Sequence, residues 1–248
     1  MKPRLLISND DGVDSPFLPI FLEEMSAVAD LQIVVPAMEQ SWIGRAYSRH
    51  KKLTLSETSV NGFKVKTIDG TPSDCVNIAL SHLCEADAVV SGINIGQNIG
   101  MPLLWSSGTF SAAAEGASWG LPSFAFSMRL EKKYYEACRL EHKMPNDGIL
   151  EKNLRDASKK SAEYVIESLE SGFAKPLYVC NVNFPIQYCA ETPFKECAVA
   201  KAKIKPLYVR DGGNFEFKYA MEALPSDELT DYKCLESGWA CHSRVCVV

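Results

Sequence analysis

An apolar run that ends in two adjacent acids opens the chain: Leu5-Leu6-Ile7-Ser8-Asn9-Asp10-Asp11-Gly12-Val13-Asp14. The apolar part predicts a buried parallel strand, and the residues after it predict a turn. In open α/β sheets, ligands bind beyond the carboxyl ends of the strands, where these acids would lie. Removing two adjacent carboxylates from water is costly unless a cation or hydrogen bonds compensate their charge. The stretch therefore predicts either a cation site or an acidic loop that caps the next helix.

Strands and helices alternate along the chain after this stretch. Continuous apolar runs predict further buried strands at 32–36, 86–91, 121–127 and 177–182. Amphipathic or small-residue patterns predict helices at 17–28, 71–83, 110–116 and 154–169. Ser15 and Pro16 would begin the first helix, as its N-cap and its first residue. Because such alternation is typical of right-handed crossovers, it predicts the α/β class with a doubly wound, mainly parallel sheet.

The remaining segments predict additions to this sheet. Residues 51–68 alternate around Asn61-Gly62, which is typical of a β-hairpin. Residues 129–153 are polar and rich in paired charges, and we expect them to form an exposed insertion. Short β-like segments near the end predict a C-terminal antiparallel β appendage. We therefore divide the chain into a core domain at 1–197 and a β extension at 198–248.

The composition is that of an ordinary soluble globular protein. The 248 residues are 46% hydrophobic and 23% charged, with a formal net charge of −5. This charge gives no electrostatic reason to expect a nucleic acid or an anionic membrane as a stable partner. No run of about 18 or more apolar residues predicts a transmembrane helix, and Met1-Lys2-Pro3-Arg4 leaves no room for a signal peptide before the first strand. These features predict a cytoplasmic location.

The nine cysteines are an odd number, and none forms a Cys-x-x-Cys pair. Their spacing fits neither a zinc motif nor a disulfide framework. We expect most of them to be buried, reduced thiols that pack as small apolar side chains.

Side chains with oxygen donors follow three of the predicted strands. They belong to Asn9-Asp10-Asp11, to the loop that contains Ser41, and to Ser91-Gly92-Ile93-Asn94. Carboxylate, hydroxyl and amide oxygens without sulfur or imidazole suit Mg²⁺ or Mn²⁺ and argue against zinc. Ser107-Gly108-Thr109 precedes a predicted helix, whose first N–H groups attract anions. A divalent cation beside an anion site is typical of enzymes that transfer or hydrolyse phosphoryl groups.

Each of these features also has a plain structural explanation. Ser107 would serve as an ordinary N-cap, Asn94 and Asn98 as turn residues, and Ser41 as a loop serine. The functional interpretation depends on all of them meeting at the strand ends of one sheet.

The motifs in the first half of the chain resemble those of the SurE family of nucleotidases. The resemblance is collinear over about residues 4–128. It is carried by Ile7-Ser8-Asn9-Asp10-Asp11-Gly12, Val35-Pro36-Ala37 with Ser41, Gly70–Val76, Val90–Gly100, and Ser107-Gly108-Thr109 with Ala113–Gly116. The resemblance implies a Rossmann-like core and a C-terminal extension that forms homodimers or homotetramers. It also implies a phosphatase that uses one divalent metal ion, Mg²⁺ or Mn²⁺, to hydrolyse nucleoside 5′- and 3′-monophosphates.

The resemblance also implies roles for single residues. The metal ligands would be Asp10, Asp11, Ser41 and Asn94, and the two aspartates would be catalytic. Substrate or phosphate contacts would come from Asn98, Ser107, Gly108 and Thr109. Asn9 would belong to the same group of residues and support these contacts from the layer next to them. In this hypothesis water attacks phosphorus with one aspartate as general base. Direct attack by water and a covalent aspartyl intermediate both remain open.

Two other classes of function remain open at this point. Receiver domains in signalling also bind Mg²⁺ through adjacent acids after the first strand. They need an acceptor aspartate at the end of a central strand, where this chain has Ser91 and Gly92. A nucleotide-binding protein without catalysis would use the same crevice.

Overall fold

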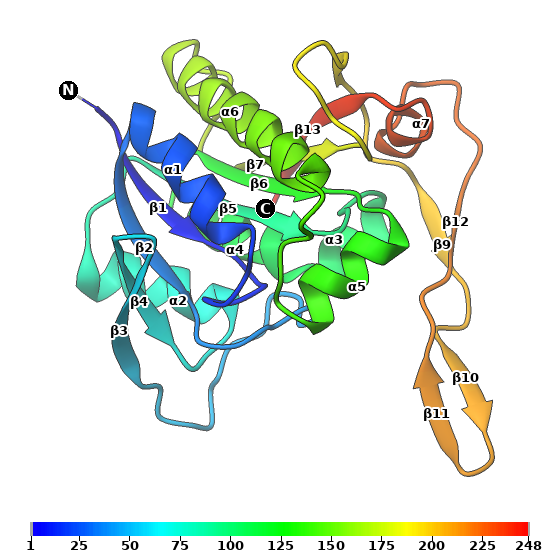
Figure 1. Ribbon diagram of the computed structural model, residues 1–248, viewed down its shortest axis with the longest axis horizontal. Coiled ribbons are helices and arrows are strands. Elements are labelled where there is room, and N and C mark those ends of the chain that lie inside the picture. The colour runs from blue at the N-terminus through cyan, green and yellow to red at the C-terminus, as the bar shows by residue number, and fades with distance from the viewer. Residues whose placement is uncertain (1, 248) are drawn as a thin grey trace.

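A nine-stranded sheet with helices on both faces forms the core of the computed structural model, which describes residues 2–247 (Figure 1). The strands are β1 (Arg4–Ser8), β2 (Asp30–Pro36), β3 (Leu55–Val60), β4 (Phe63–Ile68), β5 (Ala88–Ile95), β6 (Ser123–Met128), β7 (Tyr178–Phe184), β8 (Phe194–Glu196), β9 (Ala202–Ile204), β10 (Tyr208–Asp211), β11 (Asn214–Phe217), β12 (Met221–Ala223) and β13 (Ala240–Cys246). The helices are α1 (Leu18–Val28), α2 (Pro72–Ile78), the π-helical turn η1 (Ala79–Leu83), α3 (Met101–Ser106), α4 (Gly108–Ser118), α5 (Lys132–Leu140), α6 (Ile149–Glu170) and α7 (Asp231–Glu236).

Parallel pairing builds the centre of the sheet. The strand order is β3-β4-β2-β1-β5-β6-β7-β13-β8, and the six strands from β4 to β7 in this order pair in parallel. The predicted α/β class with a doubly wound, mainly parallel sheet is therefore confirmed. Because β1 lies between β2 and β5, the sheet grows in opposite directions on its two sides. Ligands of open α/β sheets bind at such a switch point.

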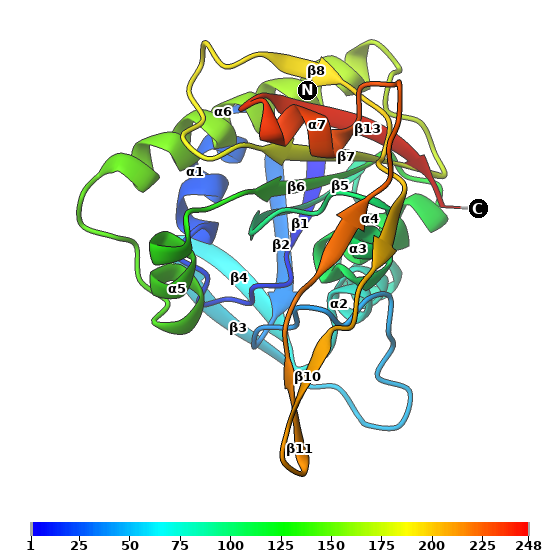
Figure 2. The same ribbon diagram turned by 90° about the vertical axis from the view of Figure 1, so that its right-hand side faces the viewer.

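Helices cover both faces of this sheet. Helices α1 and α6 pack together on one face, and α2 and α4 pack together on the other, as the side view shows (Figure 2). Strand β1 contributes to both layers, because Leu5 and Ile7 join one apolar cluster while Leu6 joins another. This two-sided burial explains the continuous apolar run of the opening stretch. No helix among residues 2–247 is long and apolar enough to cross a membrane.

Two local predictions have different outcomes. The hairpin is confirmed as β3 and β4, with Asn61 and Gly62 both at positive φ in the turn. The predicted start of the first helix is wrong, because α1 begins at Leu18 with Phe17 as N-cap. The Ser15 carbonyl accepts a hydrogen bond from the Leu18 amide at 3.1 Å, so Ser15 forms a separate turn before the helix.

The C-terminal part of the chain divides between the sheet and an extension. Strands β9 and β12 pair with each other, as do β10 and β11, and together they form an arm that projects from the core (Figure 1). In contrast, β13 lies in the central sheet, antiparallel to β7. The sequence pattern assigns residues 240–246 to the appendage, but their buried side chains pack within the core. The boundary at residue 198 stays a prediction.

Candidate active site

The carboxyl ends of β1, β2 and β5 bring the three predicted loops together. Asp10 and Asp11 follow β1, and Ser41 lies in the loop after β2. The Gln40 amide donates to the Asp10 carbonyl at 2.7 Å, which joins these two loops. The Ile95 amide donates to Asp11 Oδ2 at 2.9 Å, which joins the acidic turn to the end of β5. The expected meeting of these loops at one sheet edge is observed.

The first turn of α4 lies against Asp10. Thr109 donates its hydroxyl to Asp10 Oδ1 at 2.6 Å. Ser107 caps the helix, since its hydroxyl accepts from the Phe110 amide at 3.0 Å. A Cβ atom at Gly108 would lie 2.7 Å from the Asp10 Cβ, so the close approach requires glycine. The segment Ser107-Gly108-Thr109 thus brings the positive end of a helix dipole to the acidic pair.

Burial makes the acidic pair electrostatically costly. Asp10 and Asp11 are each only 3% exposed. Desolvation raises the pKa of Asp10, although the hydrogen bond from Thr109 opposes the shift. Desolvation and the charge of Asp10 raise the pKa of Asp11 to about 7, although Arg139 opposes the shift. Because burial disfavours two adjacent negative charges, this place favours a cation.

Arg139 on α5 supplies a positive charge at this place. Its guanidinium contacts the carboxylates of Asp11 and Glu39 and the hydroxyl of Ser41. The Arg139 side chain is only 10% exposed. A cationic group therefore lies among residues that the sequence predicts as metal ligands, which supports the interpretation of this place as a cation site.

The segment 129–153, which contains Arg139, is only partly exposed. Tyr134 and Cys138 are buried against the core, and their spacing of four residues places both on one face of α5. The sequence does not predict Arg139 at the site, because the charge-rich pattern of this segment is typical of a solvated surface. The apolar pair is the available signal that α5 packs on the core.

Asn98 is fixed by polar residues of the sheet. Its amide donates to Asn183 Oδ1 at 2.8 Å, and its carbonyl accepts from the Asn181 side chain at 3.0 Å. Its side chain donates to Ser127 at 2.9 Å and to Thr109 at 3.4 Å. Sequence reasoning misses the two asparagines of β7, although buried asparagines at alternate positions of an apolar strand are unusual.

The other two predicted asparagines have different surroundings. Asn9 donates to the Gly12 carbonyl at 3.0 Å and accepts from the Gly12 amide at 3.2 Å. It therefore shapes the acidic turn, and its role toward a substrate stays a prediction. Asn94 donates to the Gly96 carbonyl at 2.9 Å and lines the same cavity as Asp10.

The buried carboxylate of Glu115 on α4 holds the loop after Ser41. It accepts hydrogen bonds from Arg45 and Asn77, both at 2.8 Å, and from the Tyr47 hydroxyl. Burial opposes ionisation of Glu115, but these donors lower its pKa overall. The loop that carries Ser41 is thereby anchored to the helix whose N-terminus faces Asp10.

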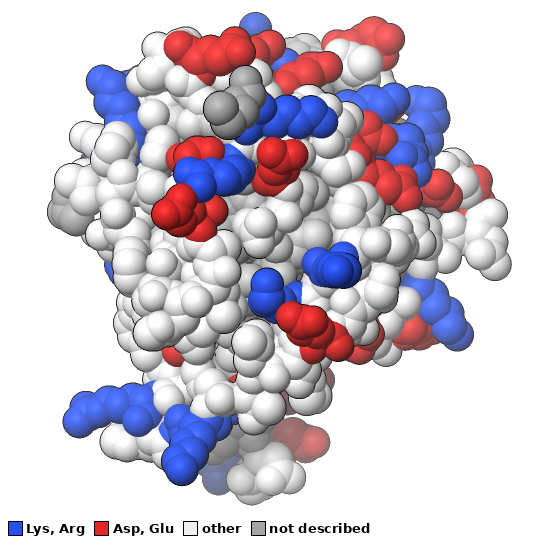
Figure 3. All heavy atoms as spheres, turned by 90° about the vertical axis from the view of Figure 1, so that its left-hand side faces the viewer, with Lys and Arg blue, Asp and Glu red and all other residues white. Residues whose placement is uncertain are grey.

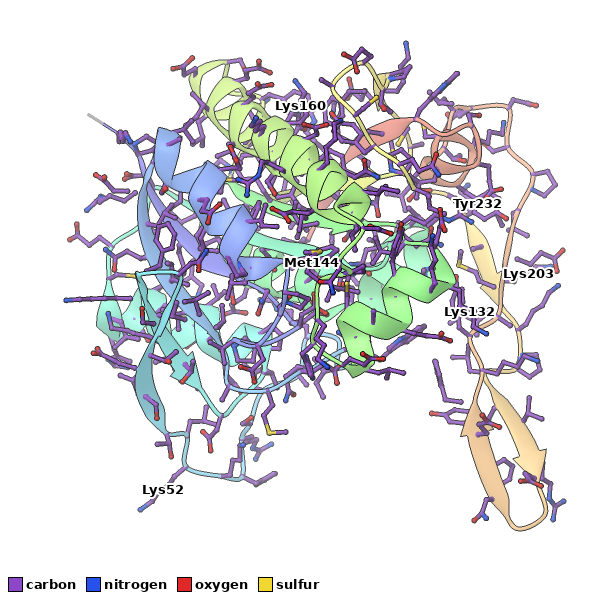
Figure 4. All side chains as sticks on the ribbon, viewed as in Figure 1. Lys52, Lys132, Met144, Lys160, Lys203 and Tyr232 are labelled. Carbon is purple, nitrogen blue, oxygen red and sulfur yellow. The ribbon has the colours of Figure 1, made fainter. Side chains whose placement is uncertain are left out.

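A cavity of about 490 Å³ borders the predicted site, and its volume is within the range of small-molecule sites. The predicted site residues that line it are Asp10, Ser41, Asn94, Asn98 and Ser107. Aromatic side chains also line it, and they belong to Trp42, Tyr135, Phe217 and Tyr219. The rings of Trp42 and Phe217 are 4.9 Å apart at their centroids, so the extension meets the core here. Lys132, labelled in Figure 4 and located at the start of α5, also lines the cavity.

The arrangement combines two binding chemistries. Oxygen atoms of carboxylates, a hydroxyl and an amide are the ligands that hard divalent cations prefer. The residues that could hold such a cation are Asp10, Asp11, Ser41 and Asn94. The N-terminus of α4 can bind an anionic group beside them.

The fold and this site define an α/β protein of a known structural type. The crystal structure of the SurE protein from Aquifex aeolicus superposes with a TM-score of 0.72, covering 99% of this chain and 94% of that one at 24% identity. This likeness shows the common fold.

The family follows from the sequence comparisons. The model of the survival protein SurE family matches residues 5–207. The 5′-nucleotidase SurE of Methanoculleus marisnigri is 34% identical over 186 residues, which are 75% of this chain and 68% of that protein. The 5′-nucleotidase SurE of Pyrobaculum arsenaticum is 32% identical over 240 residues, which are 95% of this chain and 86% of that protein. The chain belongs to the SurE family, as its motifs predict.

Proposed function

We propose that this chain is a divalent-metal-dependent phosphomonoesterase that hydrolyses nucleoside 5′- and 3′-monophosphates to nucleoside and phosphate. The observation that carries the proposal is the buried pair Asp10 and Asp11, placed against the N-terminus of α4. Family membership and the names of the 5′-nucleotidase relatives support the same activity. A cytoplasmic location is part of the proposal and rests on the sequence.

The residues of the site fit a divalent cation. Their donors are all oxygen atoms, and the contacts of Arg139 show that positive charge is accommodated there. Mg²⁺ or Mn²⁺ held by Asp10, Asp11, Ser41 and Asn94 would lower the pKa of bound water and neutralise charge on the phosphoryl oxygens.

The chain's own groups would carry the remaining tasks. Asp10 lines the cavity, so it is well placed to take a proton from the attacking water. The first turn of α4 and Ser107 would orient the phosphate, because free N–H groups at a helix N-terminus can donate to an anion. The Thr109 hydroxyl keeps Asp10 in position through its bond to Oδ1. Asn98, fixed by β7, would contact a phosphate oxygen.

The aromatic side chains of the cavity support a nucleoside as the rest of the substrate. Trp42, Phe217 and Tyr219 line the same cavity as Asp10. Stacking of a base on such rings contributes about 1–3 kcal/mol. Figure 3 shows the side of the molecule away from the extension, where acidic and basic side chains are interspersed with uncharged surface. Such a mixture does not favour a long nucleic acid on that side.

A substrate and metal panel tests the proposed function. Phosphate release would be measured from AMP, 3′-AMP, ADP and short polyphosphate with Mg²⁺, Mn²⁺ or EDTA. We expect steady turnover of the monophosphates with metal, loss of turnover with EDTA, and recovery when metal is restored. Tight AMP binding without turnover would instead identify a binding protein. Stable labelling of one aspartate by acetyl phosphate would identify a signalling module.

Replacing Arg139 is expected to strengthen metal binding. In the wild-type chain the Arg139 guanidinium must leave Asp11 and Ser41 before a metal ion can bind them, and its positive charge repels that ion. Arg139→Met removes both effects. We expect Mn²⁺ affinity to rise about tenfold, or about 1.4 kcal/mol, by isothermal titration calorimetry. Lys133→Met is the matched control, because Lys133 lies on the same helix with its side chain 63% exposed. Equal or weaker Mn²⁺ binding in the Arg139 variant would show that the guanidinium does not compete with metal.

The extension is proposed to assemble the chain into homodimers or homotetramers. The β10–β11 hairpin exposes large apolar side chains, with Tyr208 60% and Phe215 67% exposed. Burying such a surface against another copy is favourable. We expect Tyr208→Glu combined with Phe215→Glu to lower the assembled fraction measured by light scattering at micromolar concentration. Asn214→Glu on the same hairpin is the control. A wild-type chain that is monomeric throughout would contradict the proposal.

A further inference from the structure

Three cysteines from separate elements meet behind the base of the extension. Cys197 follows β8, Cys234 lies on α7, and Cys241 lies on β13. Their sulfur atoms all lie within 4.8 Å of one another. Cys234 and Cys241 are 0% and 1% exposed, whereas Cys197 is half-buried and connects the cluster to the surface. No sequence motif predicts this cluster, because the three residues share no short spacing.

The geometry of the cluster suits a thiophilic metal ion. Zinc binds thiolate sulfur at about 2.3 Å, which places its sulfur ligands about 3.8–4.0 Å apart. The three sulfur atoms, all within 4.8 Å of one another, already lie close to that separation. A disulfide would involve only two of the three thiols, whereas a metal ion can bind all three. Soft sulfur donors also select zinc over the hard cation that the oxygen donors of the active site prefer.

We propose that Cys197, Cys234 and Cys241 form a zinc-binding site, distinct from the active site. Each thiol loses its proton to solvent when the metal binds, the three thiolates displace water molecules from the hydrated ion as three S–Zn bonds form, and no oxidation or reduction occurs. Three thiolates leave the fourth position of tetrahedral zinc for a water molecule, which the half-buried side of Cys197 admits.

The proposed site lies where several connections converge. The Cys197 amide donates to the His242 carbonyl, and the Trp239 amide donates to the Cys234 carbonyl, both at 2.9 Å. Asp231, at the start of α7, accepts from the Gly100 amide at 2.8 Å and from the Ala200 amide at 2.9 Å. Zinc would therefore fix α7, β13 and the chain before the extension in one unit. That unit holds Gly100, the N-cap residue of α3, near the cavity.

Cobalt(II) titration of the reduced full-length chain tests this proposal. Cobalt bound by thiolates gives a near-ultraviolet charge-transfer band and intense visible bands of tetrahedral geometry, which oxygen ligands do not give. We expect the charge-transfer band to saturate at about one equivalent and to disappear when zinc is added. Asp10→Asn should retain this band, which separates the sulfur site from the active site. Zinc should also raise the midpoint of thermal unfolding by several degrees.

Cys197→Ser and Cys84→Ser form the matched pair of variants. Both residues are half-buried, so both variants are expected to fold. Cys197→Ser should weaken zinc binding at least about tenfold in competition with a chromophoric chelator, whereas Cys84→Ser should not change it. The absence of a thiolate–cobalt band in the wild-type chain would overturn the proposal. So would equal zinc affinity in the two variants.

Discussion

Asp10→Asn is expected to lower kcat/KM for nucleoside monophosphates at least about 10³-fold in Mn²⁺. The substitution removes a metal-binding charge and the proposed general base, and loss of a base alone typically costs about 10²–10⁴-fold. Asparagine keeps an oxygen that can accept the Thr109 hydrogen bond. Because burial raises the pKa of Asp10, its charge opposes folding in the metal-free chain. The variant should therefore unfold at the same temperature as wild type or higher, measured without metal by circular dichroism.

Asp14→Asn is the control for this prediction. Asp14 lies in the same acidic turn but is exposed to solvent, so its substitution should leave kcat/KM within about twofold. Near-normal turnover by Asp10→Asn in Mn²⁺ would show that the acidic pair does not carry the reaction.

Gly108→Ala is expected to lower kcat/KM about 10²-fold although it changes no polar group. The new Cβ would lie 2.7 Å from the Asp10 Cβ and 3.1 Å from the Gln40 carbonyl oxygen. The first turn of α4 must then move away from Asp10, and a displacement of about 1 Å can cost this much activity. Crowding of this kind also lowers the free energy of unfolding by about 1–3 kcal/mol, which urea denaturation would measure.

Gly213→Ala is the matched control for the loss of a glycine. No atom lies within 4 Å of the place that its new Cβ would occupy on the hairpin, so neither activity nor stability should change noticeably. If Gly108→Ala retained full activity, the close approach of α4 to Asp10 would have no catalytic importance.

Local patterns were sufficient to predict the centre of the fold. The apolar run of β1 could be recognised because both faces of the sheet are covered, and Asn61-Gly62 determined the hairpin turn. The acidic turn and the segment around Gly108 could be identified because each follows or begins a regular element. Their meeting then follows from the geometry of parallel sheets.

Features that depend on distant packing could not be predicted in the same way. Arg139 reaches Asp11 only because Tyr134 and Cys138 anchor α5 to the core. Strand β13 joins the sheet beside β7 through pairing between residues about 60 positions apart, which no local pattern specifies. Phe217 reaches the cavity because it ends β11 at the base of the hairpin, where its ring contacts Trp42.

Metal binding by the acidic pair can be measured from the anomalous scattering of a crystal grown with Mn²⁺. We expect one strong anomalous peak at the carboxyl ends of β1, β2 and β5, bound by oxygens of Asp10, Asp11, Ser41 and Asn94, with the Arg139 guanidinium displaced. Asp10 and Asp11 pointing apart, with no manganese between them and Arg139 still in place, would contradict it.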